Sequence, residues 1–348
     1  MKIVIFSPTS TLLEFSDSQP LGGADSTLIT MIKTLTIAGN EISAYIPVKK
    51  EFGFNNAKIY PFNSIFDFPL ECDLLILYRK VWAVPNNVKY KKCVFYSQDT
   101  ADTPCFAGLK GNRNALNMYD KVWVLSEYHK NNIKALFDVP EDKFTIIGNF
   151  AEVQEDVEKV PLQFIYASTP FRGLEVLLKA WQSIVAKYPS ATLHVFSSMK
   201  IYGAEQLDDL HFGRMFNDMK SGRFKNLIFH GSKPQKEMLE CMKKSFMLLY
   251  PNTYPETYCN VLMEARACKT PFITSNLGAL KETGSHAGCY IEGHARTPEY
   301  LQKFLDTLDF IIADPNFYAT LQNNCNPIRT YEDYRNDLLN EVTRLNKD

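Results

Sequence analysis

The chain lacks the features of several large protein classes. None of its 348 residues lies in an unbroken apolar run of the roughly 18 residues that a membrane span needs. Lys and Arg number 38 against 39 Asp and Glu, so no excess of either charge favours nucleic acid or an anionic membrane. The 8 cysteines include no C-x-x-C pair or short cluster, which indicates reduced thiols. We therefore expect a cytoplasmic globular protein that binds no nucleic acid and touches a membrane at most peripherally.

Several catalytic motifs are also missing. The sequence contains no G-x-G-x-x-G, which dinucleotide-binding enzymes use, and no G-x(4)-G-K-[ST] phosphate loop. It contains no D-x-D, and its 6 histidines show no metal-ligand spacing such as H-E-x-x-H. These absences exclude the usual dehydrogenases and P-loop enzymes, and we expect neither a cofactor nor a metal. His194 and His230, in two apolar runs, are expected to be packed or edge histidines rather than catalysts.

Short runs rich in Val, Ile, Phe and Tyr alternate with segments of helical period, which is typical of βα units around parallel sheets. The charged stretch Glu152–Lys159, which looks like a solvated linker, separates two series of such runs. The first series is Lys2–Phe6, Glu41–Ile46, Asp73–Tyr78, Cys93–Tyr96, Val122–Leu125 and Phe144–Ile147. The second is Gln163–Ala167, Thr192–Phe196, Leu227–Phe229, Met247–Tyr250 and Phe272–Thr274.

These series predict an α/β protein with two Rossmann-like doubly wound domains. We place the first domain at residues 1–150, a linker at 151–161 and the second domain at 162–326. Residues 327–348 are expected to form a C-terminal helix that packs back on the first domain. Because ligands bind at the carboxyl ends of strands in such sheets, two facing sheets would form a central ligand cleft.

The segment after the predicted strand Met247–Tyr250 carries the strongest chemical signal. It opens with prolines and becomes helical at about Thr257, so a helix N-terminus would point out of the sheet edge and attract a phosphate. Glu256 precedes this helix start and Glu264 lies two turns inside the helix. Carboxylates accept hydrogen bonds from sugar hydroxyls, so a nucleotide sugar fits both groups, although two glutamates at this spacing are common in helical regions. The predicted nucleotide-sugar-binding residues here are Glu256, Thr257, Tyr258, Cys259, Asn260 and Glu264.

A second candidate loop follows the predicted strand Gln163–Ala167. It contains Ser168 and Thr169 and leads to Arg172, at the mouth of a predicted helix over Gly173–Lys187. An arginine at the positive end of a helix is unfavourable unless an anion is present, so Arg172 is expected to hold a diphosphate, with a surface cation as the alternative.

A glycine pair marks a third loop. Gly22 and Gly23 directly precede a predicted helix that runs to about Ala38. Paired glycines let backbone N–H groups approach a ligand closely, although such a pair is often only a turn.

At these segments the chain resembles the retaining GT-B-fold glycosyltransferases of family 4. The family signature is E-x(7)-E followed by A-x-A-x-G-x-P-V-I, and here Glu256 and Glu264 are followed by A-R-A-C-K-T-P-F-I, which departs at Lys269 and Phe272. The loop S-T-P-F-R-G-L resembles members that read S-x-P-x-R-G-L, and G-G-A-D resembles G-G-A-E. The resemblance covers essentially the whole chain and is strongest over 165–173 and 251–273.

The resemblance implies that the first domain is on the acceptor side and that the second binds the donor, and it implies roles for particular residues. Gly22 and Gly23 would lie near the donor diphosphate and the acceptor. Glu264 would bind the nucleotide ribose, Glu256 would lie near the transferred sugar, and Arg172 would hold the diphosphate. Gln98 and Asp99 occupy a strand end where relatives often carry His-Asp, so they would contact the donor sugar. The predicted catalytic residues are therefore Glu256, Arg172, Gln98 and Asp99. Relatives carry a further arginine upstream of Arg172, where this chain has Ala167 and Ser168.

Together these features predict a metal-independent glycosyltransferase. It would move a sugar from a nucleotide-sugar donor to a glycan, lipid-linked or small-molecule acceptor with retention of anomeric configuration. A GT-B sugar-nucleotide epimerase and a non-catalytic nucleotide-sugar-binding scaffold are the alternatives. Lys80, Trp82 and the run Lys89–Lys92 could dock a lipid-linked acceptor, although a solvated loop and edge strand is the simpler interpretation.

Overall fold

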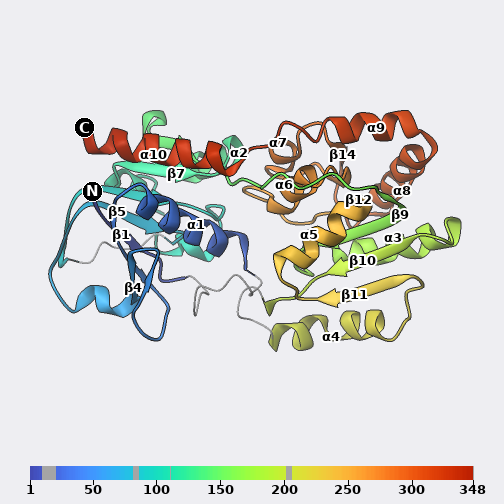
Figure 1. The fold of residues 1–348 in the computed structure, drawn as a ribbon, viewed down its shortest axis with the longest axis horizontal. Helices are drawn as coiled ribbons and strands as arrows, with labels where there is room; N and C mark the ends of the chain where they lie inside the picture. The colour runs from blue at the N-terminus through green and yellow to red at the C-terminus, as the bar shows by residue number, and fades with distance from the viewer. Residues whose placement is uncertain (10–20, 81–85, 110, 201–205, 348) are drawn as a thin grey trace. The chain divides into compact units, whose positions relative to one another are not determined.

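The computed structural model describes residues 1–9, 21–80, 86–109, 111–200 and 206–347 (Figure 1). The chain forms two compact units. Unit 1 contains β1 (Lys2–Phe6), the segment Gly22–Asn149 and the C-terminal helix from Tyr331, whereas unit 2 contains Phe150–Thr330.

Unit 1 is built on a sheet whose described strands run in the order β3-β4-β2-β1-β5-β6-β7-β8. Neighbouring strands are parallel except for β3 and β4. The chain order reverses between β1 and β5, as in a doubly wound sheet. After β1, the elements are α1 (Gly23–Ile37), β2 (Glu41–Ile46), β3 (Phe52–Phe54), β4 (Ala57–Pro61), β5 (Leu70–Tyr78), β6 (Val88–Tyr96), β7 (Lys121–Val124), α2 (Glu127–Leu136), β8 (Phe144–Ile146) and α10 (Tyr331–Lys347), with 3-10 turns at Phe62–Phe66, Pro104–Leu109, Ala115–Met118 and Glu141–Lys143.

The C-terminal helix α10 is a full member of unit 1. One face of the helix buries Tyr334, Leu338 and Val342. The carboxylate of Glu341, also buried, accepts hydrogen bonds from Trp123 Nε1 in β7 (3.3 Å) and from the Thr145 hydroxyl in β8 (2.9 Å). These bonds compensate the burial of the charge and fix the helix on the sheet.

Unit 2 is a parallel sheet of the described strands in the order β11-β10-β9-β12-β13-β14, and its chain order reverses between β9 and β12. Both units therefore have the predicted doubly wound architecture. The elements are β9 (Val160–Ala167), α3 (Leu174–Lys187), β10 (Thr192–Phe196), α4 (Gln206–Lys220), β11 (Leu227–Gly231), α5 (Gln235–Lys244), β12 (Ser245–Tyr250), α6 (Asn260–Ala267), β13 (Phe272–Ser275), α7 (Leu280–Gly284), β14 (Gly288–Ile291), α8 (Pro298–Ala313) and α9 (Pro315–Asn323).

Helix α3 illustrates how the sequence pattern produces the layers of unit 2. Its buried residues include Leu174, Leu177 and Trp181, which lie on one face of the helix. Burial of each such side chain contributes roughly 2 kcal/mol. The Trp181 indole N–H donates to the carbonyl of Lys225 (2.9 Å), so this polar group is satisfied inside the core.

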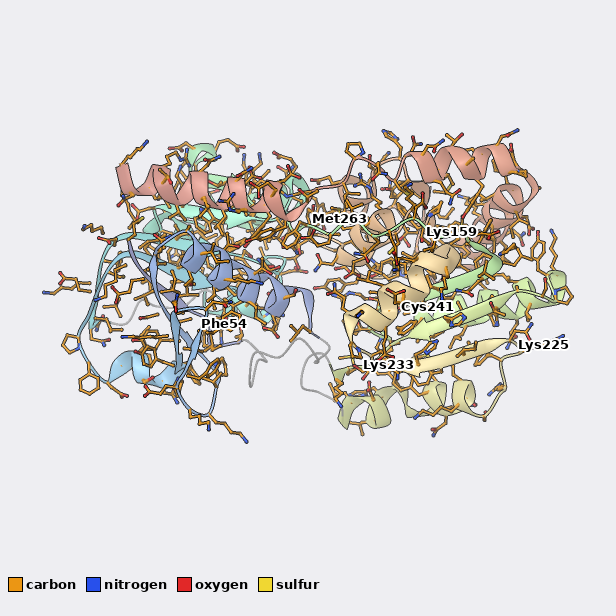
Figure 2. The ribbon with its side chains drawn as sticks, viewed as in Figure 1. Phe54, Lys159, Lys225, Lys233, Cys241 and Met263 are labelled. Carbon is orange, nitrogen blue, oxygen red and sulfur yellow. The ribbon has the colours of Figure 1, made fainter. Side chains whose placement is uncertain are left out.

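The expected solvated linker differs from the structure at its end. Strand β9 begins at Val160, inside the predicted linker range. The side chain of Lys159, which Figure 2 labels, bonds to the protein rather than extending into solvent. The Lys159 ammonium donates to the carbonyls of Lys243 (2.7 Å) and Cys268 (2.8 Å) and to the Thr270 hydroxyl (2.7 Å). The two carbonyls lie at the ends of α5 and α6, where a cation is favoured, so Lys159 ties both helices to the start of β9. Burial lowers the pKa of Lys159 to about 8.

Two further features differ from the sequence expectation, one domain boundary and the position of a basic run. Residues 327–330 remain with unit 2, where Ile328 packs against Ala151, Met263 and Ala267. The basic run Lys89–Lys92 lies inside β6 and pairs with β5, while Trp82 lies outside the described residues. No helix among the described residues combines the length and hydropathy needed to cross a bilayer.

Candidate active site

The two loops that the sequence singled out in unit 2 follow neighbouring strands. Ser168–Gly173 follows β9, and Pro251–Cys259 follows β12. Strands β9 and β12 are hydrogen-bonded parallel neighbours, and the chain order reverses between them. Ligands of doubly wound sheets bind at the carboxyl ends of the strands at this reversal, so both loops lie where the fold favours a ligand site.

Arg172 and Glu256 form an ion pair at the centre of this region. Arg172 Nε lies 2.7 Å from Glu256 Oε1, and the two side chains are 16% and 11% exposed. Arg172 Nη1 also donates to the Thr169 hydroxyl (2.8 Å), and the Tyr250 hydroxyl donates to Glu256 Oε1 (3.0 Å). The sequence predicts an anion at Arg172, and in the structure the Glu256 carboxylate occupies that place.

Two aromatic rings flank the guanidinium. The Cζ atom of Arg172 lies 4.9 Å from the ring centroid of Phe171 and 5.0 Å from that of Tyr254. The two rings meet edge to face with centroids 5.9 Å apart, and the Thr253 hydroxyl donates to the carbonyl of Phe171 (2.8 Å). These contacts fix the plane of the guanidinium, which is a requirement for bidentate binding of a phosphate.

Glycines allow the loops of the site to approach closely. A Cβ at Gly173, where φ is +98°, would lie 2.0 Å from the carbonyl oxygen of Pro251. A Cβ at Gly278, where φ is +62°, would lie 2.6 Å from the carbonyl oxygen of Glu256 and 2.7 Å from its nitrogen. Both positions therefore require glycine for two reasons, the left-handed backbone and the absence of space.

The predicted helix start at Thr257 is wrong, because α6 begins at Asn260 with Cys259 as its N-cap. The residues just before α6 are instead hydrogen-bonded to the loop after β13. The Ala279 N–H donates to the carbonyl of Glu256 (2.8 Å), and Pro255 restricts the backbone before it. Glu264 consequently lies one turn inside α6 rather than two, and Asn260 is the first helical residue.

Glu264 is half-buried and bonded to α5. Gln235 Nε2 donates to Glu264 Oε1 (2.5 Å). Burial raises the pKa of Glu264 to about 7, although the bond from Gln235 opposes this rise. The carboxyl is therefore held in a place where its charged form is disfavoured, which makes Glu264 a candidate functional-site residue.

The other predicted donor-binding residues differ in their surroundings. The Ser168 and Tyr250 hydroxyls lie 3.4 Å apart, and the carbonyl of Thr169 accepts from the Tyr166 hydroxyl (2.8 Å). Thr257 is buried, as is Cys259, whose thiol pKa is raised well above its ordinary value by burial and by the charge of Glu256.

Tyr258, predicted as a donor contact, has a packing role. Its ring packs against the cluster of Ala151, Met263, Ala267 and Ile328. Its hydroxyl lies 3.8 Å from Met263 Sδ, and burial raises its pKa to about 12.

In unit 1, the glycine pair lies at the start of α1. Gly22 is the N-cap and Gly23 the first helical residue, which agrees with the predicted position. The helix start is anchored by Tyr78, at the end of β5, whose hydroxyl donates to the carbonyl of Ala24 (2.6 Å). Because β1 and β5 flank the order reversal of this sheet, the pair also lies where the fold favours a ligand site.

Gln98 and Asp99 follow β6. Gln98 is buried, and Asp99 forms an ion pair with Arg79 (Nε to Oδ2, 2.8 Å), a partner that the sequence did not indicate. Asp99 Oδ2 also accepts from the Cys105 thiol (3.3 Å). Arg79 has a φ of +70°, a left-handed conformation that is strained for a residue with a side chain. The Asp99 carboxylate is thus fixed by neighbours at the carboxyl end of the sheet.

The histidines do not gather into a metal centre. His194 Nδ1 and His230 Nε2 lie 2.9 Å apart in the adjacent strands β10 and β11, and burial lowers the pKa of both rings. Over the described ranges, no group of three or more His, Cys, Asp and Glu side chains could hold a metal ion.

Sequence reasoning missed the groups that hold Arg172 and Glu256 in place. Phe171 and Tyr254, beside the motif residues, could have been found as aromatic neighbours of a cation. In the sequence, Tyr250 is only the end of a predicted strand, and Gly278 lies outside the motifs. Gln235, the partner of Glu264, carries no sequence signal.

Comparison with known proteins points to one class. Residues 163–309 match the family model described as "Glycosyl transferases group 1". The D-inositol 3-phosphate glycosyltransferase of Rhodococcus jostii is 24% identical over 175 residues, which are 49% of this chain and 36% of that relative. The chain thus spans about a third of the length of this curated relative.

Solved structures match over nearly the full chain. Sucrose-phosphate synthase from Thermosynechococcus elongatus is similar with a TM-score of 0.73 and 13% identity, covering 99% of this chain and 98% of that one. HepE from Anabaena, solved in complex with UDP-glucose, has a TM-score of 0.70 and 14% identity, covering 99% and 100%. The fold is therefore the GT-B fold. The family match and the name of the sequence relative support a glycosyltransferase.

Proposed function

We propose that the protein is a retaining glycosyltransferase that binds a nucleotide-sugar donor on unit 2. The observation that carries this proposal is the Arg172–Glu256 pair at the strand-order reversal of unit 2, inside the segment that matches the glycosyltransferase family. A guanidinium suits a diphosphate and a carboxylate suits sugar hydroxyls, so their juxtaposition fits a sugar diphosphate.

Each residue has a proposed part in donor binding. Arg172 and the backbone N–H groups at the start of α6 hold the diphosphate and stabilise the charge that develops as it leaves. Glu264 accepts hydrogen bonds from the ribose, and Glu256 does so from the transferred sugar. This role fits the raised pKa of Glu264, because hydroxyl donors stabilise the charged form that burial disfavours.

The chemistry proposed follows from the family resemblance. The acceptor hydroxyl attacks the anomeric carbon on the face from which the diphosphate departs, and its proton passes to a diphosphate oxygen. The C–O bond to the diphosphate breaks as the new glycosidic bond forms, so the configuration is retained. Because Arg172 and α6 supply the positive charge, we propose that no metal is required. In unit 1, the glycine pair would contribute to binding of the acceptor, and Gln98 and Asp99 would contribute to binding of the donor sugar.

A donor screen tests this proposal. UDP-, GDP-, ADP- and dTDP-sugars are added to the purified protein, and the unfolding midpoint is measured. A cognate donor at 100 times its dissociation constant stabilises by about 2.7 kcal/mol. Arg172→Ala and Glu264→Ala should lose this stabilisation, whereas the control Arg335→Ala, which removes an arginine of α10 whose side chain is 40% exposed, should keep it.

A transfer assay with the stabilising donor then separates the reaction classes. Sugar transfer with retained configuration supports the proposal. Conversion of the donor without an acceptor would indicate an epimerase, and binding without turnover under any acceptor would indicate a scaffold. Unchanged transfer in Arg172→Ala would contradict the diphosphate assignment.

A further inference from the structure

A cavity of unit 2 lies outside the proposed donor site. Its volume is about 520 Å³, within the usual range for small-molecule sites. The walls come from α3, from α4, from the loop before α3 and from Arg296, which precedes α8. None of the groups proposed to bind the donor lines this cavity.

The inner wall of this cavity is apolar. Leu178 is buried, whereas Phe171, Phe212, Met215 and Phe224 are only half-buried although they are large apolar side chains. Exposed apolar surface gathered in a concave site is more typical of a ligand site than of a solvated groove.

The rim of the cavity carries positive charge that the chain does not neutralise. Arg296 Nε is paired with Glu175 Oε1 at 2.5 Å, and Asp218 is paired with Arg223 at 2.7 Å. Lys179 and Arg214 are exposed, and within the described part of the chain neither has an ion-pair partner. Two cations therefore stand uncompensated beside an apolar wall.

We propose that this cavity binds a small amphipathic anion, an organic phosphate or carboxylate that carries an alkyl or aryl group. The apolar group would cover the phenylalanine and methionine side chains, which removes their surface from water. The anionic head would be held by Lys179 and Arg214, with Arg214 offering the planar fork that suits phosphate. A neutral ligand would leave both cations uncompensated, and a cation would be repelled by them.

The position of Phe171 links this cavity to the proposed donor site. Phe171 lines the cavity, and its ring centroid lies 4.9 Å from Arg172 Cζ. A ligand in the cavity would therefore contact one of the two rings that orient the Arg172 guanidinium. This part of the inference rests on the proposed function and predicts that the bound anion changes the KM for the donor; binding of the anion itself does not depend on that function.

The test is calorimetric titration of the full chain with octyl phosphate below its micelle concentration. Saturable binding of one molecule is expected, with 1-octanol and octyltrimethylammonium binding much more weakly. The double variant Lys179→Gln/Arg214→Gln should weaken binding by about tenfold or more, since two charge-assisted contacts are lost. The control Lys303→Gln removes an exposed cation of α8 that does not line the cavity, and it should bind normally.

Several results would overturn the proposal. These are no saturable binding of octyl phosphate, equal binding of 1-octanol, or equal affinity in the double variant and wild type. A further experiment uses phosphatidylglycerol vesicles. If the wild-type protein sediments with the vesicles, the double variant does not, and monomeric octyl phosphate does not bind, the two cations belong to a lipid-binding surface instead. Because both substituted side chains are exposed, the double variant should fold. Its basal transfer without octyl phosphate should equal that of wild type, so failure here is distinct from failure of the donor site.

Discussion

Glu264→Gln should stabilise the folded protein at pH 8 and at the same time reduce donor binding. The folded structure raises the pKa of the Glu264 carboxyl from its ordinary value near 4.5 to about 7, chiefly by burial. A raised carboxyl pKa means that stability is fully present below pH 4.5 and is lost as pH rises through 7. The ionised carboxyl therefore costs the folded state about 3 kcal/mol at pH 8. Glutamine has nearly the same shape and does not ionise, so it avoids this cost.

Urea unfolding of wild type and Glu264→Gln across pH 4.5 to 8 measures this effect. The stability difference should be near zero at the acid end and should grow to about 3 kcal/mol in favour of the variant by pH 8. Glu299→Gln, at the exposed first turn of α8, is the matched control for a Glu→Gln change at a carboxyl that is not buried. A variant that is less stable than wild type at pH 8 would refute the reasoning. Unchanged donor affinity in Glu264→Gln would also refute it, since the buried carboxylate would then have no role in binding.

Three further outcomes follow from the site and from the linker. Arg172→Met should lower the free energy of unfolding by about 3 kcal/mol because it leaves the Glu256 carboxylate buried without its cation. In a double-mutant cycle, adding Glu256→Gln should recover much of this loss, and additive losses would contradict the pairing. Gly278→Ala should lower the free energy of unfolding in urea by about 3 kcal/mol and should lower kcat. Gly222 also has a positive φ, +78°, but open space around it, so Gly222→Ala should lower the free energy of unfolding by only about 1 kcal/mol. Equal costs would show that the close approach at Gly278 is unimportant. Burial lowers the pKa of Lys159 from 10.5 to about 8, so wild-type stability relative to Lys159→Met should rise by about 3 kcal/mol between pH 8 and 10.5, and a flat difference would place that ammonium in solvent.

The fold could be predicted from the sequence because its signals are local. Strands buried on both faces, such as β12, appear as unbroken apolar runs, and helices such as α3 show their buried face as a repeat of about 3.6 residues. The element order then leaves few topologies for parallel strands joined by helices. The boundaries were less accurate where contacts from elsewhere decide them. Val160 joins β9 because β12 pairs with it, which the charged sequence before it does not reveal.

The candidate site was only partly predictable. Its motifs identified Arg172 and Glu256 separately, but no local signal says that two loops at opposite ends of a long sequence segment meet at 2.7 Å. The start of α6 was misplaced for the same reason, since the bond from Ala279 to Glu256 comes from a different loop. In unit 1, the pairing of Asp99 with Arg79 likewise depends on the adjacency of β5 and β6. Pairing across a sheet edge is a property of the assembled fold, so these contacts required the structure.

We propose that unit 2 holds a nucleotide sugar between Arg172 and Glu264. A crystal structure of the protein with the donor that stabilises it most would test this claim directly. The diphosphate should lie at Arg172 and at the start of α6, with the ribose hydroxyls on the Glu264 carboxylate. A donor bound elsewhere, or a ribose that leaves Glu264 bonded only to Gln235, would contradict it.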